Sequence, residues 1–398
     1  MKLLLIVDRF DRSALCESAW WMGDVAAHAV NQGWQVEAVC RDPLGVAPLG
    51  VTVHPHGSLG LESALSDGLS SRPDLVYLAT PGPFSSRMVE AIGQSPTIVD
   101  VLSHWPLCPN DDLMWRPSFH RCDLRFPADE CGPCAGIERL REMDSRSRLV
   151  SRASAIVTHA RFQAERLSGL LARPVECISP GVDSEWFRSD PAPPAGPAAL
   201  ALYESRGQRP RVVLLGPPTH ARGSGVLLDV IVGVRARVSD AEFVIAGDDA
   251  ANPGWDRAIL TELRELGLAD QVRLLGRVDP CDWPAVIASS DVGVAPSLWD
   301  DPCGVFVLQA FACGVPVVAS GRGAHAELLQ HGSGMLASPQ SPALFADRVA
   351  MLLTHHDARH AMGEAARLHA VEHHDLAVSL DAIAQLMMRC TGEMRRAA

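Results

Sequence analysis

The sequence predicts a two-domain α/β protein in which each domain is a doubly wound parallel sheet. Short apolar runs alternate with helical patterns along most of the chain, which is typical of parallel sheets with crossover helices. A Pro-rich segment interrupts this alternation near the middle, and the alternation then restarts. A length of 398 residues also suits two domains of similar size better than one core.

The first half of the chain is expected to form one Rossmann-like domain over residues 1–188. An amphipathic helix is expected over 19–31, because its apolar spacing is helical and Gly33 follows it. Buried strands are expected over 3–7, 36–39, 75–79, 97–102, 155–157 and 175–178.

The second half is expected to begin after a linker over 189–210, whose Pro, Ala and Gly content disfavours regular structure. The second domain is expected over 211–375. The last segment, 376–398, is expected to be a helix that crosses back to the first domain. Strands of the second domain are expected over 212–215, 243–246, 272–275, 292–295 and 315–318.

Composition excludes several classes of protein. The formal net charge of -12 disfavours nucleic-acid binding, which depends on dense Lys and Arg. No apolar run reaches the ~18 residues of a membrane helix. The apolar N-terminus stops at Asp8, so it fits a strand better than a signal peptide, and a cytoplasmic location is expected. A homo-oligomer is compatible with this composition.

Two common nucleotide-binding motifs are missing. The loop after the first strand, residues 8–16, has no glycine, so it cannot form the pyrophosphate turn of a dehydrogenase. The Gly-rich loop of a nucleoside triphosphatase does not occur either. Any nucleotide site must therefore be built from other loops.

The most informative stretch is 296–320, which alternates strand, loop, helix, turn and strand. Its loop ends at Gly304, where a helix opens, and a helix N-terminus offers free N–H groups and a positive dipole to phosphate. Gln309 follows Asp301 by eight positions, on roughly the same helix face. An ordinary βαβ unit with a polar loop is the alternative interpretation.

This stretch resembles the retaining, GT-B-fold glycosyltransferases of family 4, the glycosyl transferases group 1. Those enzymes carry a similar pattern with two acidic residues eight apart, at the positions of Asp301 and Gln309. The resemblance extends over most of the chain through spaced motifs in the same order, at 180–183, 272–277, Gly323, Glu327, Gly332 and Gly334.

The resemblance implies that the second domain binds a nucleotide-sugar. Asp301 would hold sugar hydroxyls and Gln309 the ribose, while the loop 276–278 would hold the base. Further donor-binding groups are implied around the sugar and the phosphates, namely backbone N–H groups and cationic side chains. The full set of implied donor-binding residues is Gly216, Arg222, Gly276, Arg277, Val278, Asp301, Cys303, Gly304, Val305, Gln309 and Arg322.

The sequence departs from the family at several of these positions. Asp301 and Gln309 replace glutamates, Arg222 replaces a lysine, and Pro217 replaces an arginine. Since Pro217 cannot contact phosphate as an arginine does, Arg322 is expected to compensate, with His220 as the weaker alternative.

In the first domain, the position of the family's catalytic-site histidine holds Leu102, and His104 follows two residues later. His104 is therefore expected near the acceptor, with packing or surface exposure as the alternative. Together with Asp301 and Arg222, it completes the expected catalytic set.

The expected reaction is transfer of a sugar from a GDP- or UDP-sugar onto an acceptor, with retention and without a catalytic metal. The acceptor is expected to be a small molecule of a natural-product pathway. The alternative is a catalytically weak protein of the same fold that binds nucleotide-sugars. A sugar-nucleotide epimerase would need a base for which no constellation is present.

A cluster of cysteines lies in an expected insertion over residues 105–136. Cys131 and Cys134 form a C-x-x-C knuckle, and four thiolates suit a structural zinc ion. His120 is a substitute ligand. A loop of free thiols or a pair of disulfides is the alternative. The four expected ligands are Cys108, Cys122, Cys131 and Cys134.

Overall fold

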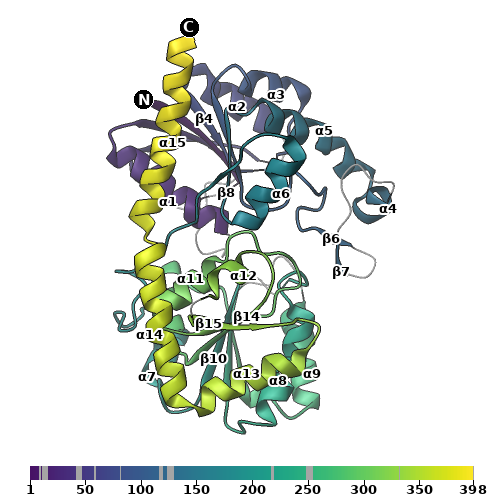
Figure 1. Cartoon of the computed structure of the whole chain (residues 1–398), viewed down its shortest axis with the longest axis vertical. Helices are drawn as coiled ribbons and strands as arrows, with labels where there is room; N and C mark the ends of the chain where they lie inside the picture. Colours follow the sequence, from purple (N-terminus) through teal and green to yellow (C-terminus); the bar gives the residue numbers. More distant parts are fainter. Residues whose placement is uncertain are drawn as a thin grey trace. The chain divides into compact units, whose positions relative to one another are not determined.

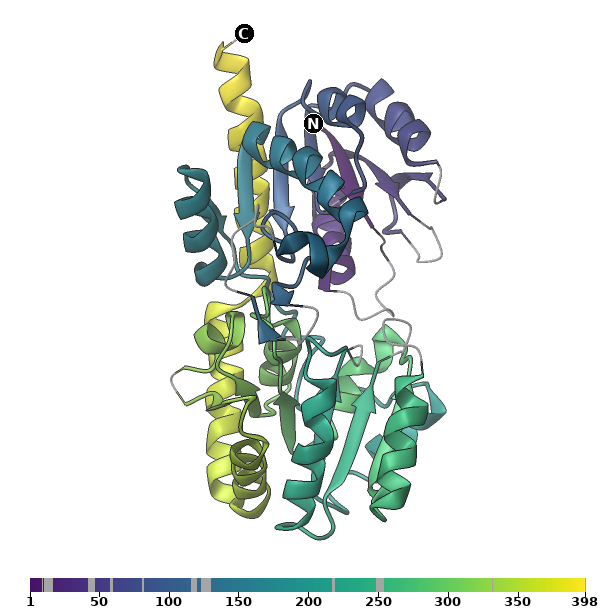
Figure 2. The ribbon, with the colours of Figure 1, turned by 90° about the vertical axis from the view of Figure 1, so that its right-hand side faces the viewer.

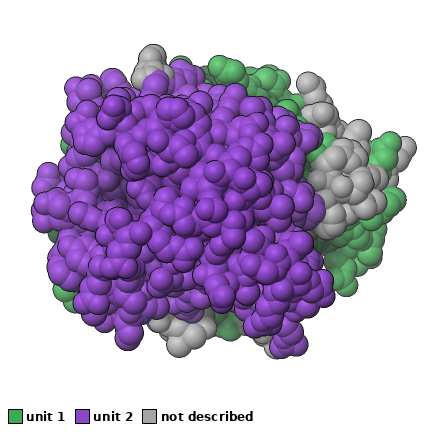
Figure 3. All heavy atoms as spheres, turned by 90° about the horizontal axis from the view of Figure 1, so that it is seen from below, with its two compact units in different colours: residues 1–12, 16–180, 377–398 green, residues 13–15, 181–376 purple. Residues whose placement is uncertain are grey.

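The chain forms two compact units in the computed structural model (Figure 1, Figure 3). All residues are described except 9, 11–16, 42–46, 58–59, 81, 116–119, 123–129, 217–218, 248–253, 331 and 398, and the side chains of 17–18, 115, 120 and 393–397. Unit 1 comprises the described residues among 1–180 together with 377–398, and unit 2 comprises residues 181–376.

Unit 1 is built on a parallel sheet with seven strands among its described residues, in the order β3-β2-β1-β4-β5-β8-β9. These strands are β1 (Lys2–Val7), β2 (Gln35–Cys40), β3 (Val51–Pro55), β4 (Leu75–Leu78), β5 (Thr97–Val101), β8 (Ala155–Thr158) and β9 (Glu176–Cys177). A separate antiparallel hairpin pairs β6 (Met114–Trp115) with β7 (His120–Arg121).

Alternate residues of each strand point to opposite faces of the sheet. Because apolar side chains lie on both faces, helices cover both of them (Figure 2). The helices of unit 1 are α1 (Glu17–Asn31), α2 (Leu61–Ser70), α3 (Ser86–Ile92), α4 (Cys131–Ala135), α5 (Ile137–Arg152), α6 (Arg161–Leu171) and α15 (Leu376–Ala397). Leu4 and Ile6 of β1 share a buried apolar cluster with α2, α3, α5 and α6. On the other side, α15 lies beside α1, where His28 Nε2 is 3.4 Å from Asp381 Oδ1 (Figure 1).

Unit 2 repeats this architecture with a parallel sheet of six described strands, in the order β12-β11-β10-β13-β14-β15. The strands are β10 (Arg211–Leu215), β11 (Glu242–Ala246), β12 (Val272–Gly276), β13 (Val292–Ala295), β14 (Val317–Ser320) and β15 (Gly334–Ala337). Its helices are α7 (Pro197–Glu204), α8 (Ser224–Arg235), α9 (Trp255–Glu265), α10 (Trp283–Ala288), α11 (Val305–Ala312), α12 (Ala324–Leu328), α13 (Pro342–Thr354) and α14 (His356–His373), with short 3-10 turns at Ala269–Gln271 and Pro280–Asp282.

Apolar side chains decide which helices cover the sheet of unit 2. Leu227 and Ile231 of α8, Leu263 of α9 and Phe345 of α13 are fully buried in one cluster with the strands. α11 packs against both α10 and α14, and α10 packs against α7, while Met362 of α14 also reaches that cluster. No described helix is both long enough and apolar enough to cross a membrane.

Most of the expected strands are present, and the differences have local causes. β3 was not predicted because it alternates apolar and polar residues, and β15 was not predicted because it has only four residues, begins with glycine and is half buried. The strand expected over 315–318 is instead β14 (Val317–Ser320), since the preceding residues form the turn after α11. The strand expected over 175–178 is reduced to the two exposed residues of β9. The segment 189–210, expected to lack regular structure, contains α7.

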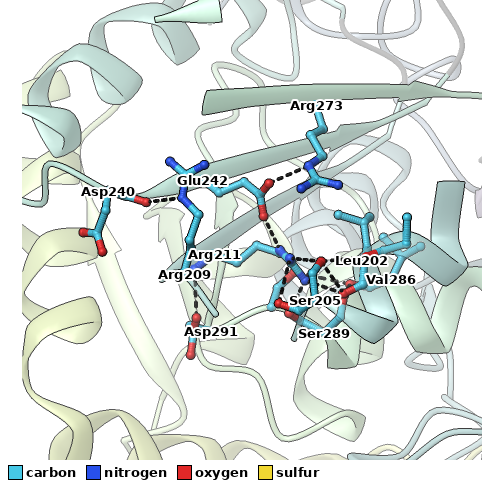
Figure 4. A network of polar contacts seen from close by, with 12 residues as sticks. Leu202, Ser205, Arg209, Arg211, Asp240, Glu242, Arg273, Val286, Ser289 and Asp291 are labelled. Carbon is cyan, nitrogen blue, oxygen red and sulfur yellow. Dashed lines mark hydrogen bonds and ion pairs between the residues drawn. The ribbon is translucent and has the colours of Figure 1, made fainter. Parts of the chain in front are cut away.

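A buried ion-pair network fixes the amino ends of the strands in unit 2 (Figure 4). Arg211 begins β10 and is 1% exposed, and its Nε donates to Glu242 Oε2 of β11 at 2.7 Å. Its Nη1 donates to the carbonyls of Leu202 and Ser289, and its Nη2 to Ser205 Oγ. Because each nitrogen of the guanidinium has an acceptor, a buried charge is tolerated and α7 is tied to the sheet.

Glu242→Gln is expected to lower the free energy of unfolding of unit 2 by about 3–5 kcal/mol, because it leaves the buried Arg211 charge without its carboxylate. Denaturant unfolding followed by circular dichroism measures this loss. The matched control is Asp347→Asn, which removes the exposed partner of Arg237 and is expected to cost less than about 1 kcal/mol. Equal losses in both variants would contradict a structural role for the network.

Candidate functional site

The strand order of unit 2 marks one edge of its sheet as the candidate site. β10 lies between β11 and β13, so the chain winds outward in both directions from this point. Ligands of doubly wound sheets bind beyond the carboxyl ends of the strands at such a reversal. Residues 219–223 and 296–304 form loops after β10 and β13 there. These loops are joined because the N–H groups of Leu298 and Trp299 both donate to Ala221 O, at 2.7 and 3.1 Å.

Two glycines allow the loops at this edge to pack closely. Gly223 has φ +85°, and a Cβ there would lie 2.1 Å from Pro296 O. Gly323 has φ +57°, and a Cβ there would lie 2.3 Å from Asp301 O. Both the left-handed backbone and the contact exclude larger residues. The loops after β10, β13 and β14 are thereby held against one another.

Asp301 lies in the middle of these loops and is 3% exposed. Its Oδ1 accepts hydrogen bonds from the N–H groups of Cys303 at 3.0 Å and Gly304 at 2.7 Å, just before α11 begins at Val305. Of the three N–H groups that the resemblance points to, two therefore already have an acceptor within the loop. Asp301 Oδ2 lies 3.7 Å from His325 Nε2 of α12.

Burial alone would raise the pKa of Asp301, but the charge that His325 carries when protonated, the charge of Arg222 and the two N–H donors outweigh it, so this pKa is lowered. Burial lowers the pKa of His325, Asp301 opposes this shift, and Arg222 adds to it. At neutral pH the pair is therefore a carboxylate beside a neutral imidazole.

Two arginines lie beside the loop that follows β13. The guanidinium carbon of Arg222 is 5.9 Å from the centre of the Trp299 ring, and a Cβ on Gly216 would lie 3.0 Å from Arg222 Nη1. The side chain of Arg222 therefore folds back over the carboxyl end of β10. Arg322, after β14, donates from Nη1 to Leu298 O at 2.5 Å, so its guanidinium is turned toward this loop.

The other expected donor-binding residues lie farther along the same unit. Gly276 ends β12, and its carbonyl accepts from Gly247 N at 2.9 Å; Arg277 is exposed and Val278 is buried. This loop is therefore at the same edge, two strands from β10. Gln309 lies more than one turn into α11 and is 8% exposed.

Unit 1 holds His104 within its core. The residue has no exposed surface. Its backbone N–H donates to the carbonyl of Asp111 at 2.9 Å, and the centre of its ring lies 6.1 Å from that of Phe162. Leu102, two residues earlier, is also buried. A catalytic role for His104 stays a prediction, and such complete burial does not favour direct contact with a substrate.

Unit 1 contains a buried carboxylate of its own, which was not predicted from the sequence. Asp100 of β5 is fully buried and accepts from Tyr77 Oη at 2.5 Å and Trp21 Nε1 at 2.9 Å, while its other oxygen contacts His159 Nε2 at 2.7 Å. Burial, with a contribution from Asp100, raises the pKa of Tyr77 well above its ordinary value. The only sequence signal is an aspartate within an otherwise apolar strand.

None of the four cysteines of the insertion forms a disulfide in the described part of the chain, which contradicts the disulfide alternative. Burial raises the pKa of Cys108, which disfavours its thiolate form. Within the described part of the chain, no three His, Cys, Asp or Glu side chains gather in a group able to hold a metal ion. The zinc prediction thus finds no support in the geometry. The side chain of its substitute ligand, His120, lies outside the described residues. Pro217, the position of the missing phosphate-binding arginine, also lies outside them.

An arginine holds the start of this insertion. Arg146 of α5 is buried and donates from Nη1 to Asp111 Oδ1 at 2.6 Å, and it also reaches the carbonyls of Trp105 and Cys108, each at 3.5 Å. Its Nη2 donates to Glu142. The charged pair and the carbonyls together fix the loop that follows β5.

Comparison with known proteins agrees with the resemblance found in the sequence. Residues 209–355 match the family described as Glycosyl transferases group 1. A GDP-mannose-dependent alpha-(1-6)-phosphatidylinositol monomannoside mannosyltransferase of Mycobacterium tuberculosis is 34% identical over 207 residues, which cover 49% of this chain and 51% of that protein. A D-inositol 3-phosphate glycosyltransferase of Segniliparus rotundus is 26% identical over 58% of this chain and 52% of its own length. The chain thus spans about half the length of these curated relatives.

Solved structures show the same fold over nearly the whole chain. A structure of Anabaena Alr3699/HepE in complex with UDP and glucose superposes with a TM-score of 0.71 at 18% identity, covering 98% of this chain and 100% of that one. A sucrose-phosphate synthase of Thermosynechococcus elongatus gives a TM-score of 0.73 at 15% identity, covering 99% and 100%. The predicted GT-B fold with two Rossmann-like domains and the resemblance to glycosyl transferases group 1 are confirmed.

Replacing Asp301 by Asn is expected to destabilise unit 2 most at neutral pH. The pKa of Asp301 is lower in the folded chain than its value of ~3.9 in an unfolded one, so its ionised form contributes stability above about pH 4. This contribution is lost as the pH falls through the folded-state pKa. Unfolding free energies of wild type and Asp301→Asn should therefore converge on acidification from pH 7 to 3. The exposed control Asp270→Asn should have nearly wild-type stability at pH 7. A constant difference would contradict this electrostatic account.

Proposed function

We propose that this protein is a retaining glycosyltransferase that moves a sugar from a GDP- or UDP-sugar to an acceptor. The match to glycosyl transferases group 1 over 209–355 supports the activity. The observation that carries the proposal is the edge of unit 2 at β10 and β13, where Arg222, Arg322 and the beginning of α11 lie around one pair of loops. Cations and a helix N-terminus are what a diphosphate requires.

In this proposal, different residues bind different parts of the donor. Arg222 and Arg322 contact the diphosphate, Asp301 Oδ2 accepts from a hydroxyl of the sugar, and Gln309 binds the ribose. The loop 276–278 lies against the base. An amide such as that of Gln309 can both donate to and accept from ribose hydroxyls.

The reaction then needs positioning and charge stabilisation and no protein nucleophile. The bond between the anomeric carbon and the diphosphate oxygen breaks, and the diphosphate leaves with the electron pair. The acceptor forms the new bond on the same face of the sugar and releases its proton to the departing phosphate oxygen. The two arginines stabilise the negative charge that develops on the diphosphate.

The donor nucleotide and the acceptor are finer parts of the proposal. One relative is named as GDP-mannose-dependent, and the Anabaena structure contains UDP, so both nucleotides are proposed. The departures at Asp301, Gln309 and Pro217 support a dedicated small-molecule acceptor of a natural-product pathway. D-inositol 3-phosphate belongs among the acceptors to test because it names the second relative.

The function is tested by measuring nucleoside diphosphate release from a panel of GDP- and UDP-sugars, with and without candidate acceptors. At least one pair is expected to release diphosphate in step with a glycoside whose anomeric configuration, read by NMR, equals that of the donor. Saturable binding of nucleotide-sugars without transfer would favour the catalytically weak binding protein instead. No binding of any nucleoside diphosphate would contradict both functions.

Arg222→Ala and Arg322→Ala are each expected to weaken nucleoside diphosphate binding about 10- to 150-fold, because each loses a charge-assisted hydrogen bond to phosphate. Binding of the nucleoside alone should change little, which calorimetry can measure. The control is Arg264→Ala, which removes an exposed arginine from the last turn of α9. If Arg322→Ala binds diphosphate like wild type, Arg322 does not compensate for Pro217.

A further inference from the structure

The two oxygens of Asp301 have different surroundings. Oδ1 accepts from the N–H groups of Cys303 and Gly304, so it is engaged in capping the segment before α11. Oδ2 accepts no backbone hydrogen bond among the described residues, and it lies 3.7 Å from His325 Nε2. A buried carboxylate oxygen without a firm donor can accept a hydrogen bond from a ligand.

The imidazole of His325 is held from its other side by Ser320. Its Nδ1 lies 3.5 Å from Ser320 Oγ, at the end of β14, and both residues are buried. A hydroxyl can donate to Nδ1, and the proton of the neutral ring then sits on Nε2, which faces the Asp301 carboxylate. The three side chains form a buried row of Ser320, His325 and Asp301.

Backbone contacts fix the distance between His325 and Asp301. The N–H of Ala324 donates to Asp301 O at 2.7 Å, and Gly323 packs directly on the backbone of Asp301. A Cβ on Gly304 would lie 3.6 Å from His325 Cδ2, so the ring also lies against the beginning of α11. Neither side chain can be displaced without moving one of these loops.

Burial keeps His325 neutral. It lowers the pKa of the ring, Asp301 opposes this shift, and Arg222 adds to it because it disfavours a second positive charge. Asp301 is the negative group that faces the ring. A neutral ring with its proton on Nε2 presents the positive end of an N–H dipole to Oδ2, 3.7 Å away, and leaves the carboxylate ionised.

We propose that His325 is a positioning residue, which orients Asp301 Oδ2 to accept a hydrogen bond from a hydroxyl of the donor sugar. This inference rests on the proposed function, because it assigns a role within the same site. His325 itself does not touch the sugar. Its loss should therefore affect the sugar part of the donor and leave the nucleoside diphosphate part bound as before.

The test compares His325→Ala and His325→Gln with wild type in donor kinetics and in nucleoside diphosphate binding. His325→Ala is expected to lower kcat/KM for the nucleotide-sugar about 5- to 30-fold, the effect of one lost hydrogen bond. The Kd of nucleoside diphosphate should stay within about twofold. His325→Gln keeps an N–H donor and should recover most of kcat/KM. The matched control is His360→Ala, an exposed histidine of α14 that should change neither quantity.

Other results would overturn the inference in distinguishable ways. An unchanged kcat/KM in His325→Ala, or an equal loss of kcat/KM and of diphosphate affinity, would mean that the ring has no positioning role for the sugar. If His325→Ala does not fold, Ser320→Ala and His325→Gln carry the test: the first should lower kcat/KM and the second should largely keep it, and the reverse order overturns the proposal. A wild-type protein that transfers no sugar from any donor contradicts the proposed function, and this inference falls with it.

Discussion

The carboxylate of Asp301 is the interaction on which the candidate site depends. One oxygen accepts from the two N–H groups just before α11, the other faces α12, and the charge interacts with Arg222 in the loop after β10. The backbone of the same residue accepts from Ala324 and leaves no room for a side chain on Gly323. A single buried residue thus couples three loops that leave three neighbouring strands. Such coupling holds ligand-binding groups in place before a ligand arrives, which lowers the cost of ordering them.

Much of the fold could be predicted from the sequence because buried parallel strands are continuous apolar runs. β10 and β11, whose residues are nearly all buried, were located to within one residue. The edge strands β3 and β15 are half buried: β3 mixes apolar and polar residues, and β15 has only four residues and begins with glycine, so neither stands out as a strand. α7 was missed because it follows a Pro-rich segment, and proline at the first helical turn begins a helix as readily as it breaks one.

The candidate site could be predicted less completely. Motif spacing placed the loops around Arg222 and Asp301 correctly at one edge, but it assigned the N–H groups of Cys303 and Gly304 to a ligand. Local chemistry explains the difference, since an aspartate commonly hydrogen-bonds backbone N–H groups two or three residues on. That signal was present in the sequence. The contact between Asp301 and His325 was not, because it joins residues 24 positions apart through the packing of two loops.

Hydrogen–deuterium exchange of the whole chain, with and without GDP or UDP, tests most directly whether the edge at β10 and β13 binds the nucleotide. The account predicts that one of these nucleotides slows exchange in the loops 219–223, 296–305 and 276–278 and leaves the opposite edge, around Arg211 and Glu242, unchanged. Protection confined to other segments, or no protection at saturating nucleotide, would contradict the assignment of the donor to this edge of unit 2.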